Sequence, residues 1–285
     1  MIYPHWGYIV TYINTRFEMK MPNQIAELLT TIDADKATLD AARPLPTHTV
    51  ASLREKLMLE WTYHSNAIEG NTLTLRETKV VLEGITVGGK SLREHFEATN
   101  HRDAILYVEE IVAKGEALSE WQVRNIHSLV LKGIDNDEAG RYRQENVVIA
   151  GASTTPPDFL HLPAEMAALV EWHDQAGAMN PVERAAELHT RFVKIHPFVD
   201  GNGRTGRLLL NFELMKFGYP PAVIRKEDRL AYYNALDHAC VSGDYGDITR
   251  LVAESVQRTL ETYLEVLGLR NEHRPGGGSS PQFRM

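Results

Sequence analysis

The sequence has a single cysteine and no long apolar run. Cys240 has no second cysteine to pair with, which excludes an internal disulfide. The N-terminus lacks the apolar segment of a signal peptide because Arg16 and Lys20 interrupt it, and these absences together favour a reducing cytoplasm. No stretch approaches the roughly 20 apolar residues that a membrane-spanning helix needs, so no membrane contact is expected.

The sequence also lacks an excess of basic residues. Its 30 Lys and Arg residues against 38 Asp and Glu residues give a formal charge of −8, which argues against nucleic acid as a partner. No internal repeat and no recognisable targeting domain is present. Hydrophobic residues make up 43% of the 285 residues, enough for a sizeable core without disulfide or metal staples.

Helical periodicity covers most of the chain. Leu53, Leu57 and Trp61 follow one face of a helix predicted over residues 50–71. Capping boxes, in which a Ser or Thr side chain bonds the backbone three residues on, predict helix starts; they pair Thr74 with Glu77, Ser91 with Glu94 and Ser119 with Gln122. The helix after Ser119 is expected to stop at Gly133. Further helices are predicted over residues 163–177, 181–195, 205–217, 229–240 and 248–267.

One segment is typical of β structure. Residues 146–150 read Asn-Val-Val-Ile-Ala, and a glycine and the breaker pair Pro156-Pro157 follow. We expect a short exposed hairpin, or flap. The predicted fold class is therefore all-α with one small β-hairpin flap.

Four regions divide the chain. Residues 1–48 form an N-terminal lead-in, in which Met19 and Met21 are alternative candidate starts. Residues 49–114 form an N-terminal helical region and residues 115–268 the core domain. The Gly-, Ser- and Pro-rich residues 269–285 form a flexible tail. The helical segments 23–60 and 74–114 are candidates for homodimer contacts, although an apolar helix face serves a core equally well.

The segment from His196 to Arg207 carries the chemistry; it reads H-P-F-V-D-G-N-G-R-T-G-R. A helix ends at the histidine, a Gly-Asn-Gly loop follows and a new helix begins. The backbone N–H groups of such a loop form an anion site, and phosphate is the obvious ligand. Arg204 and Arg207 stand three residues apart and can hold separate phosphoryl groups.

Two further side chains of this segment complete a nucleotide-phosphate site. Asp200 is a hard oxygen ligand that suits Mg²⁺, or Mn²⁺, between two phosphates. His196 has the side chain whose pKa lies near neutrality, so it is the candidate general base. Each of these residues has an ordinary structural explanation when taken alone. No structural reason requires these residues to occur together within twelve positions. Their combination therefore favours a catalytic site.

This segment resembles the signature of the Fic family, H-x-F-x-[DE]-G-N-G-R-x-x-R. The resemblance implies a helical core with a flap, Mg²⁺ on Asp200, and transfer of AMP from ATP to a Ser, Thr or Tyr hydroxyl of a target protein by way of His196. It also implies that Arg204 lies near the β phosphate and Arg207 near the γ phosphate. A phosphorylating branch of the family has lysine where this chain has Gly203, so AMP transfer is favoured. The implied ATP contacts are Asp200, Gly201, Asn202, Gly203, Arg204, Thr205, Gly206 and Arg207.

A second resemblance to the family lies upstream. Residues 65–71, S-N-A-I-E-G-N, match the inhibitory pattern [ST]-x-x-x-E-[GN]. The resemblance implies that this helix, with Ser65 and Glu69, is autoinhibitory. Glu69 would pair with Arg207 and deny it to the γ phosphate.

Residues 140–157 resemble the family's flap. Gly151, Ala152 and Ser153 are expected to touch the nucleotide, and a target segment is expected to add along the flap as an extra strand. Tyr232 and Tyr233 are expected either beside the adenine or packed into the core.

Two other functions remain compatible with these residues. The same site could run in reverse, with Glu69 orienting a water that removes AMP from a modified target, either alone or in a bifunctional enzyme. Alternatively, the chain could be a nucleotide-sensing interaction module without turnover.

Overall fold

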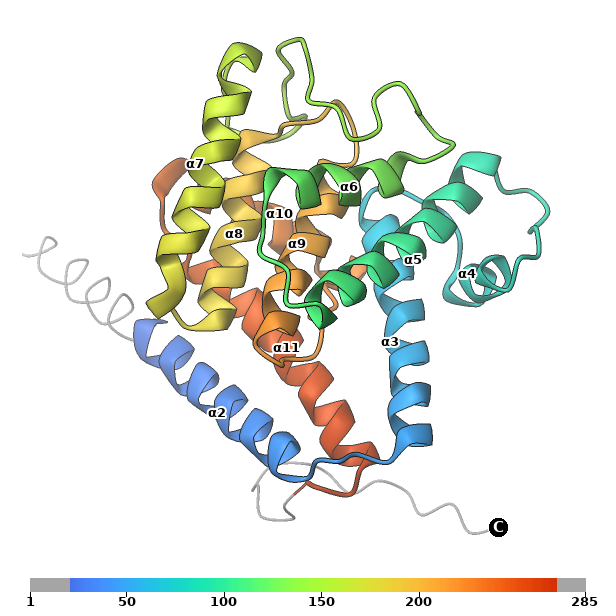
Figure 1. Ribbon diagram of the computed structural model, residues 1–285, viewed down its shortest axis with the longest axis vertical. Helices are drawn as coiled ribbons and strands as arrows, with labels where there is room; N and C mark the ends of the chain where they lie inside the picture. The colour runs from blue at the N-terminus through green and yellow to red at the C-terminus, as the bar shows by residue number, and fades with distance from the viewer. Residues whose placement is uncertain (1–20, 271–285) are drawn as a thin grey trace, which may run out of the picture.

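The structure, a computed structural model, describes residues 21–270, and all regular structure within them is helical (Figure 1). The predicted lead-in as far as residue 20, with Met19, and the predicted flexible tail from residue 271 lie outside the described residues. None of the described helices is both long and apolar enough to cross a bilayer. The α-helices are Met21–Ala41 (α2), Thr47–Ile68 (α3), Leu75–Leu82 (α4), Leu92–Ala113 (α5), Glu120–Leu131 (α6), Leu162–Gln175 (α7), Pro181–Ile195 (α8), Asn202–Lys216 (α9), Arg229–Ser242 (α10) and Gly246–Val266 (α11), and the 3₁₀ turns are Phe159–His161 (η1), Ala176–Ala178 (η2) and Lys226–Asp228 (η3).

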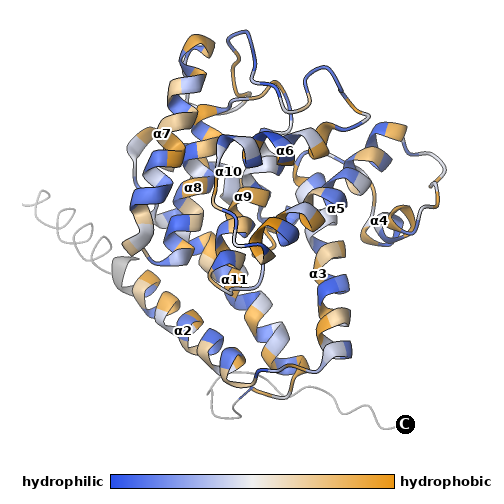
Figure 2. Ribbon diagram, in the orientation of Figure 1, coloured by the Kyte–Doolittle hydropathy of each residue, from blue (hydrophilic) through white to orange (hydrophobic). Residues whose placement is uncertain are grey.

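Helix α9 lies in the middle of the molecule and packs against α3, α5, α6 and α8 (Figure 1). Its side chains enter both large hydrophobic clusters: Leu208 and Phe212 join the cluster of α5, α6 and α7, while Leu210 and Leu214 join that of α2, α10 and α11. Helix α9 is therefore buried on all sides and has no face toward solvent. The outer helices instead alternate hydrophilic and hydrophobic residues along their length (Figure 2).

Helix α2 packs along α11. Leu29, Ile32 and Leu39 of α2 are buried in one cluster with Val256 and Leu260 of α11. Part of the segment 23–60 that was a candidate for homodimer contacts is therefore used inside the chain.

The predicted helix starts are largely confirmed. The capping boxes at Thr74 and Ser91 are complete, with both reciprocal bonds present. The box at Ser119 is half formed: Ser119 accepts the backbone N–H of Gln122, but the side-chain Oε1 of Gln122 accepts from the Tyr107 hydroxyl. A competing donor thus takes the place of the Ser119 N–H in the second capping bond.

The predicted β-hairpin is not present, and residues 21–270 contain no strand. Residues 146–150 form an irregular loop, in which the Val148 side chain is 88% exposed. The Asn146 side chain closes the loop at its base: its Nδ2 donates to Asp158 and its Oδ1 accepts the Phe159 N–H, each at 2.9 Å. The β-branched residues favour an extended chain, but a strand needs a neighbour to pair with, and the fold brings none alongside.

Several predicted helix boundaries also differ from the structure, and two of them have a clear cause. Helix α9 begins at Asn202 and not at residue 205, because only Gly201, with φ 77°, needs the left-handed conformation. The Asn202 side chain donates to the Phe198 carbonyl at 2.8 Å and accepts its N–H at 3.0 Å, which ties the first turn to the loop. Helix α3 ends at Ile68, before residue 71, because Gly70 has φ 101°.

One buried ionic cluster fastens α9 to α7 and α8. The Glu213 carboxylate of α9 has no solvent exposure; it accepts from His173 at 2.7 Å and pairs with Arg184. Replacing Arg184 with Leu removes the permanent cation and leaves the carboxylate buried. Breaking such a pair from one side typically costs about 3 to 5 kcal/mol.

We therefore expect Arg184→Leu to lower the free energy of unfolding, measured by urea denaturation, by that amount. Arg191→Leu is the matched control, since Arg191 also lies on α8 and over an aromatic ring, but its ion pair with Glu187 is at the surface. Loss of this ion pair should lower the control's free energy of unfolding by less than about 1 kcal/mol. Equal losses in the two variants would contradict this assignment.

Candidate active site

The predicted catalytic segment forms the turn between α8 and α9. His196 is the C-cap of α8 with φ 49° and ψ 58°, the one non-glycine residue with positive φ in residues 21–270. Arg143 holds this strained turn: its Nε donates to the His196 carbonyl and its backbone N–H donates to the Pro197 carbonyl, both at 2.9 Å. A non-glycine residue in this conformation persists only where its surroundings fix it.

His127 of α6 packs against the loop between α8 and α9 and hydrogen-bonds to it. Its ring stacks on Phe198 with centroids 3.5 Å apart. Nδ1 accepts the Gly140 N–H at 2.9 Å, so Nε2 carries the hydrogen and donates to the Asp200 carbonyl at 2.9 Å. Burial lowers the pKa of His127 to about 4, which keeps the ring neutral. A Cβ on Gly201 would come within 3.2 Å of this ring, so glycine suits both the positive φ and the close approach.

The N-terminus of α9 forms an anion cradle. The first hydrogen bond of the helix joins the Thr205 N–H to the Gly201 carbonyl. The N–H groups of residues 202–204 therefore have no acceptor within the helix and point out of its end. Arg204 is 2% exposed, and its Nε and Nη1 are buried without a hydrogen-bond partner. Buried donors without acceptors fit a polyanion such as a phosphate chain.

His196 lines a hollow of about 840 Å³ beside the cradle. Burial is the main reason that its pKa lies below the ordinary value of 6.5. The imidazole is therefore neutral near pH 7. A neutral imidazole at the edge of an anion site has the form that a general base requires.

Asp200 lies on the outer side of the cradle, with its side chain 46% exposed. Its Oδ1 accepts the Gly201 N–H at 2.6 Å and Arg204 at 3.2 Å. Burial alone would raise the pKa of Asp200, but Arg204 and the Gly201 N–H outweigh it and hold the pKa below its ordinary value. An ionised, solvent-accessible carboxylate fits Mg²⁺ that takes its other ligands from a nucleotide. The described residues contain no cluster of three or more His, Cys, Asp or Glu side chains that would hold a metal alone.

Arg207 is held by the last turn of α3. Its Nη2 donates to Glu69 Oε1 at 2.7 Å and to the Ser65 carbonyl at 2.8 Å, and its Nε donates to Ser65 Oγ at 3.0 Å. Burial would lower the pKa of Arg207, but Tyr232 and Glu69 raise it above its ordinary value. The pair between Glu69 and Arg207 that the resemblance implied is confirmed.

Glu69 also covers the cradle itself. A Cβ placed on Gly203 would overlap the Glu69 carboxylate. The carboxylate thus sits against the N-terminus of α9, where helix dipole and free N–H groups favour a negative charge. A side chain at position 203, lysine included, would require the Glu69 carboxylate to move away.

Other predicted site residues divide between the hollow and the core. Gly151 and Ala152 line the hollow, whereas Ser153 does not, and its N–H donates to Asp237 at 2.9 Å. Thr205 is fully buried, and Gly206 lies against the ring of His189. Their contact with a nucleotide therefore stays a prediction.

Of the two tyrosines, Tyr233 lies at the hollow and Tyr232 mainly behind it. Tyr232 is fully buried, and its hydroxyl lies 2.7 Å from Nε2 of His189 and 3.4 Å from Nη1 of Arg207. Tyr233 is 37% exposed and donates to the Ile68 carbonyl at 3.2 Å. Both line the hollow, but Tyr232 chiefly supports the buried guanidinium.

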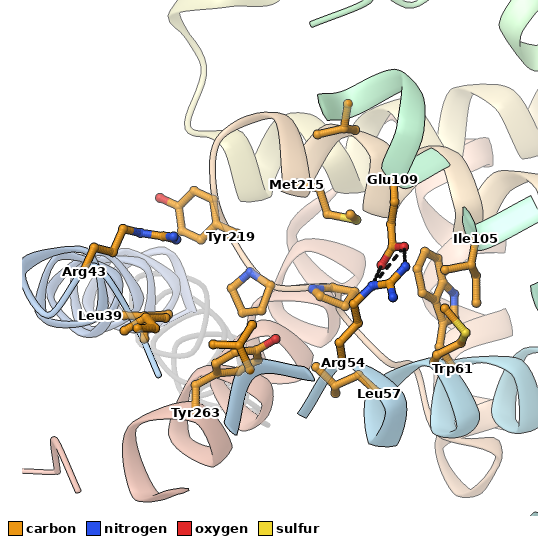
Figure 3. A pocket seen from close by; sticks show the side chains of 16 residues that line it. Leu39, Arg43, Arg54, Leu57, Trp61, Ile105, Glu109, Met215, Tyr219 and Tyr263 are labelled. Atoms are coloured by element: carbon orange, nitrogen blue, oxygen red, sulfur yellow. Dashed lines mark hydrogen bonds and ion pairs between the residues drawn. The ribbon is translucent and has the colours of Figure 1, made fainter. Parts of the chain in front are cut away.

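A second hollow, of about 260 Å³, lies apart from this segment among α2, α3, α5 and α11 (Figure 3). Its lining is mostly apolar and aromatic, and Arg54 and Glu109 form an ion pair within it (Figure 3). No residue of the segment 196–207 lines it, so it is not part of the candidate active site.

The sequence did not single out several residues that build the site. Arg143 lies within residues 140–157, the segment that resembles the family's flap, and could have been found there. His127, Asp237 and Arg93, which donates to Asp200 at 2.5 Å, lie in ordinary helices, and no local pattern marks them.

Comparison with known proteins agrees with this geometry. The model of the Fic/DOC family matches residues 117–214. A protein adenylyltransferase Fic of Nematostella vectensis is 41% identical over 206 residues, which cover 71% of this chain and 48% of that protein. The chain thus spans about half the length of the curated relatives it matches.

Two solved structures share the fold. Fic-1 (residues 134–508) from Caenorhabditis elegans superimposes with a TM-score of 0.82 at 28% identity, covering 92% of this chain and 79% of that one. A Fic-domain-containing signalling protein from Bacteroides thetaiotaomicron does so with a TM-score of 0.78 at 30% identity, covering 87% of this chain and all of that one. With the segment 196–207 complete, the chain belongs to the Fic/DOC family.

Proposed function

We propose that this chain is a protein adenylyltransferase that transfers AMP from ATP to a hydroxyl side chain of a target protein. The observation that carries the proposal is the convergence of the neutral His196, the Arg207 guanidinium and Gly203 at the N-terminus of α9 on one hollow. Relatives named protein adenylyltransferase at 35 to 41% identity support it. The hollow of about 840 Å³ has the size of a site for a nucleotide-sized ligand.

In the proposed reaction His196 takes the proton of the target hydroxyl. The hydroxyl oxygen forms a bond to the α-phosphorus of ATP, the bond from that phosphorus to the bridging oxygen breaks, and pyrophosphate leaves with the electron pair. The N–H groups of residues 202–204 and the Nε of Arg204, which is buried without a hydrogen-bond partner, bind the phosphates. Catalysis is then chiefly positioning and charge neutralisation in a preformed cradle.

Asp200 would hold the divalent cation, Mg²⁺ or Mn²⁺, together with oxygens of the nucleotide. When bound, this ion supplies further neutralisation of the phosphate charge. The chain's own contribution is an ionised carboxylate fixed by the Gly201 N–H.

Glu69 is proposed as an autoinhibitory residue. Its carboxylate engages Arg207 at 2.7 Å and covers the α9 cradle at Gly203. A γ phosphate would need both positions. ATP must therefore displace the carboxylate or bind without one of its cationic contacts, which weakens productive binding.

The loop of residues 146–152 is proposed as the docking site of the target. It borders the hollow, and Ser153 and Thr154 anchor its end to Asp237 of α10. Its backbone makes no strand pairing within the described part of the chain. A target segment with a Ser, Thr or Tyr could pair with this backbone and so present its hydroxyl to His196.

A second candidate function uses the same site in reverse. Glu69 and His196 line the same hollow, and the Glu69 side chain is 32% exposed. A carboxylate there could orient a water for removal of AMP from a modified target. Incubation of the wild-type chain with an AMP-modified protein tests this, since loss of AMP that depends on Glu69 would favour the hydrolytic direction.

We expect Glu69→Gly to raise AMP transfer, because the variant frees Arg207 and the cradle together. Incubation with ATP and Mg²⁺, followed by intact mass of the chain and labelled-ATP transfer in lysate, measures the change. A gain of at least about tenfold corresponds to removing roughly 1.4 kcal/mol of competition.

Glu83→Gly is the matched control. Glu83 is also a helix C-cap, with φ −79° and ψ 0° against −84° and 0° for Glu69, and it also precedes a glycine with positive φ. The control should leave transfer unchanged. A Glu69→Gly protein that binds ATP but adds no AMP would refute the proposed function.

The pH dependence of transfer should report His196. Because its pKa lies below 6.5, the base is already neutral at pH 7, and the rate should fall only as the pH drops through the lower value. Glu69 itself raises the pKa of His196, so Glu69→Gly should move the midpoint further down. A pH–rate profile of that variant with a midpoint above pH 7 would contradict this role.

His196→Ala should lower the rate of AMP transfer by about 10²- to 10⁴-fold.

A further inference from the structure

Arg93 occupies the outer face of the carboxylate assigned to the cation. It lies in the first turn of α5, and its Nη2 donates to Asp200 Oδ2 at 2.5 Å. Its Nε donates to Glu97 Oε1 at 3.1 Å. Arg93 is 107 residues away from Asp200 in the sequence, so the contact is made by the fold and not by the local chain.

Both oxygens of Asp200 are therefore engaged. Oδ1 accepts from Gly201 and Arg204 inside the cradle, which leaves Oδ2 as the oxygen that faces outward. A divalent cation and a guanidinium are alternatives at that oxygen, because both need the same lone pairs and carry the same sign of charge. The side chains of Arg93 and Asp200 are 57% and 46% exposed, so water screens the pair and it opens at modest cost.

The same turn of α5 contacts the segment behind the inhibitory glutamate. Asn71 follows Glu69 by two residues, and its side-chain amide donates to Glu97 Oε2 at 2.9 Å. Glu97 Oε1 in turn accepts from Arg93 and lies 3.5 Å from Nη1 of Arg204. Glu97 thus connects the chain after Glu69, the Arg93 guanidinium and the cradle. When Arg93 leaves Asp200, Glu97 remains as its partner.

We propose that Arg93 is a second inhibitory residue, which competes with the divalent cation for Asp200 and sets the cation concentration at which the nucleotide binds. This inference rests on the proposed role of Asp200 as the cation ligand. It does not require transfer of AMP. Glu69 keeps Arg207 from binding the nucleotide, whereas Arg93 keeps Asp200 from binding the metal.

The test measures binding and not turnover. In the Glu69→Gly background, an ATP analogue with a non-hydrolysable α,β linkage is titrated by calorimetry at increasing Mg²⁺. Arg93→Ala should lower the Mg²⁺ concentration for the half-maximal gain in affinity by about three- to fivefold, the size of a partly exposed ion pair. Circular dichroism of each variant checks that the helices are retained.

Arg54→Ala is the matched control. Arg54 is exposed to a similar extent as Arg93, at 52%, it also forms an ion pair, with Glu109, and the substitution changes the net charge equally. It should leave the Mg²⁺ midpoint unchanged. In an Asp200→Asn background Arg93→Ala should have no effect, since the contested oxygen is no longer a carboxylate.

Three outcomes would overturn the inference. An unchanged Mg²⁺ midpoint in Arg93→Ala is the first, and an equal shift in Arg54→Ala, which would indicate net charge alone, is the second. The third is a loss of affinity for the analogue without Mg²⁺, which would make Arg93 a phosphate-binding residue. If no variant transfers AMP but the midpoint still falls, the proposed transferase activity fails and the competition at Asp200 stands.

Discussion

The structure depends on the buried positive charge of Arg207, which needs an anionic partner. The Arg207 side chain is 4% exposed, and a buried guanidinium without an anionic partner is strongly destabilising. The last turn of α3 meets this need with the carboxylate of Glu69 and with Ser65. The position of α3 on α9 is thereby fixed by the same contact that is proposed to exclude the γ phosphate. On this proposal a nucleotide replaces one anion with another, so Arg207 is never left unpaired.

The same constraint explains why a core helix can carry the candidate catalytic segment. Helix α9 enters both hydrophobic clusters with its later turns and presents only its N-terminus to the hollow. Close packing leaves little freedom to shift, so the cradle is held before any ligand arrives. His127 and Arg143 add a second layer by fixing the carbonyls of Asp200 and His196. Preorganisation of this kind is what electrostatic catalysis of phosphoryl transfer requires.

The sequence predicted what is local and missed what is brought together by the fold. The turn between α8 and α9 and the partner of Arg207 were foreseen, since a contiguous motif and a resemblance carried them, and the anion site stays a prediction. The strand at residues 146–150 was wrong because β propensity does not supply a neighbour. His127 and Arg93 act on Asp200 across 73 and 107 residues, and no periodicity within α6 or α5 reports such a contact.

The two proposed inhibitory contacts have opposite signs, which bears on the ligand that opens them. Glu69 is an anion on Arg207, and Arg93 is a cation on Asp200. A nucleotide alone offers phosphates to Arg207 but adds negative charge beside Asp200, which strengthens the hold of Arg93 on the site. A divalent cation alone competes with Arg93 but does nothing for Arg207. On these two proposals, only the complex of the two would supply both charges. The coupling through Glu97 and Asn71 therefore favours joint opening by the metal–nucleotide complex over stepwise opening by either component.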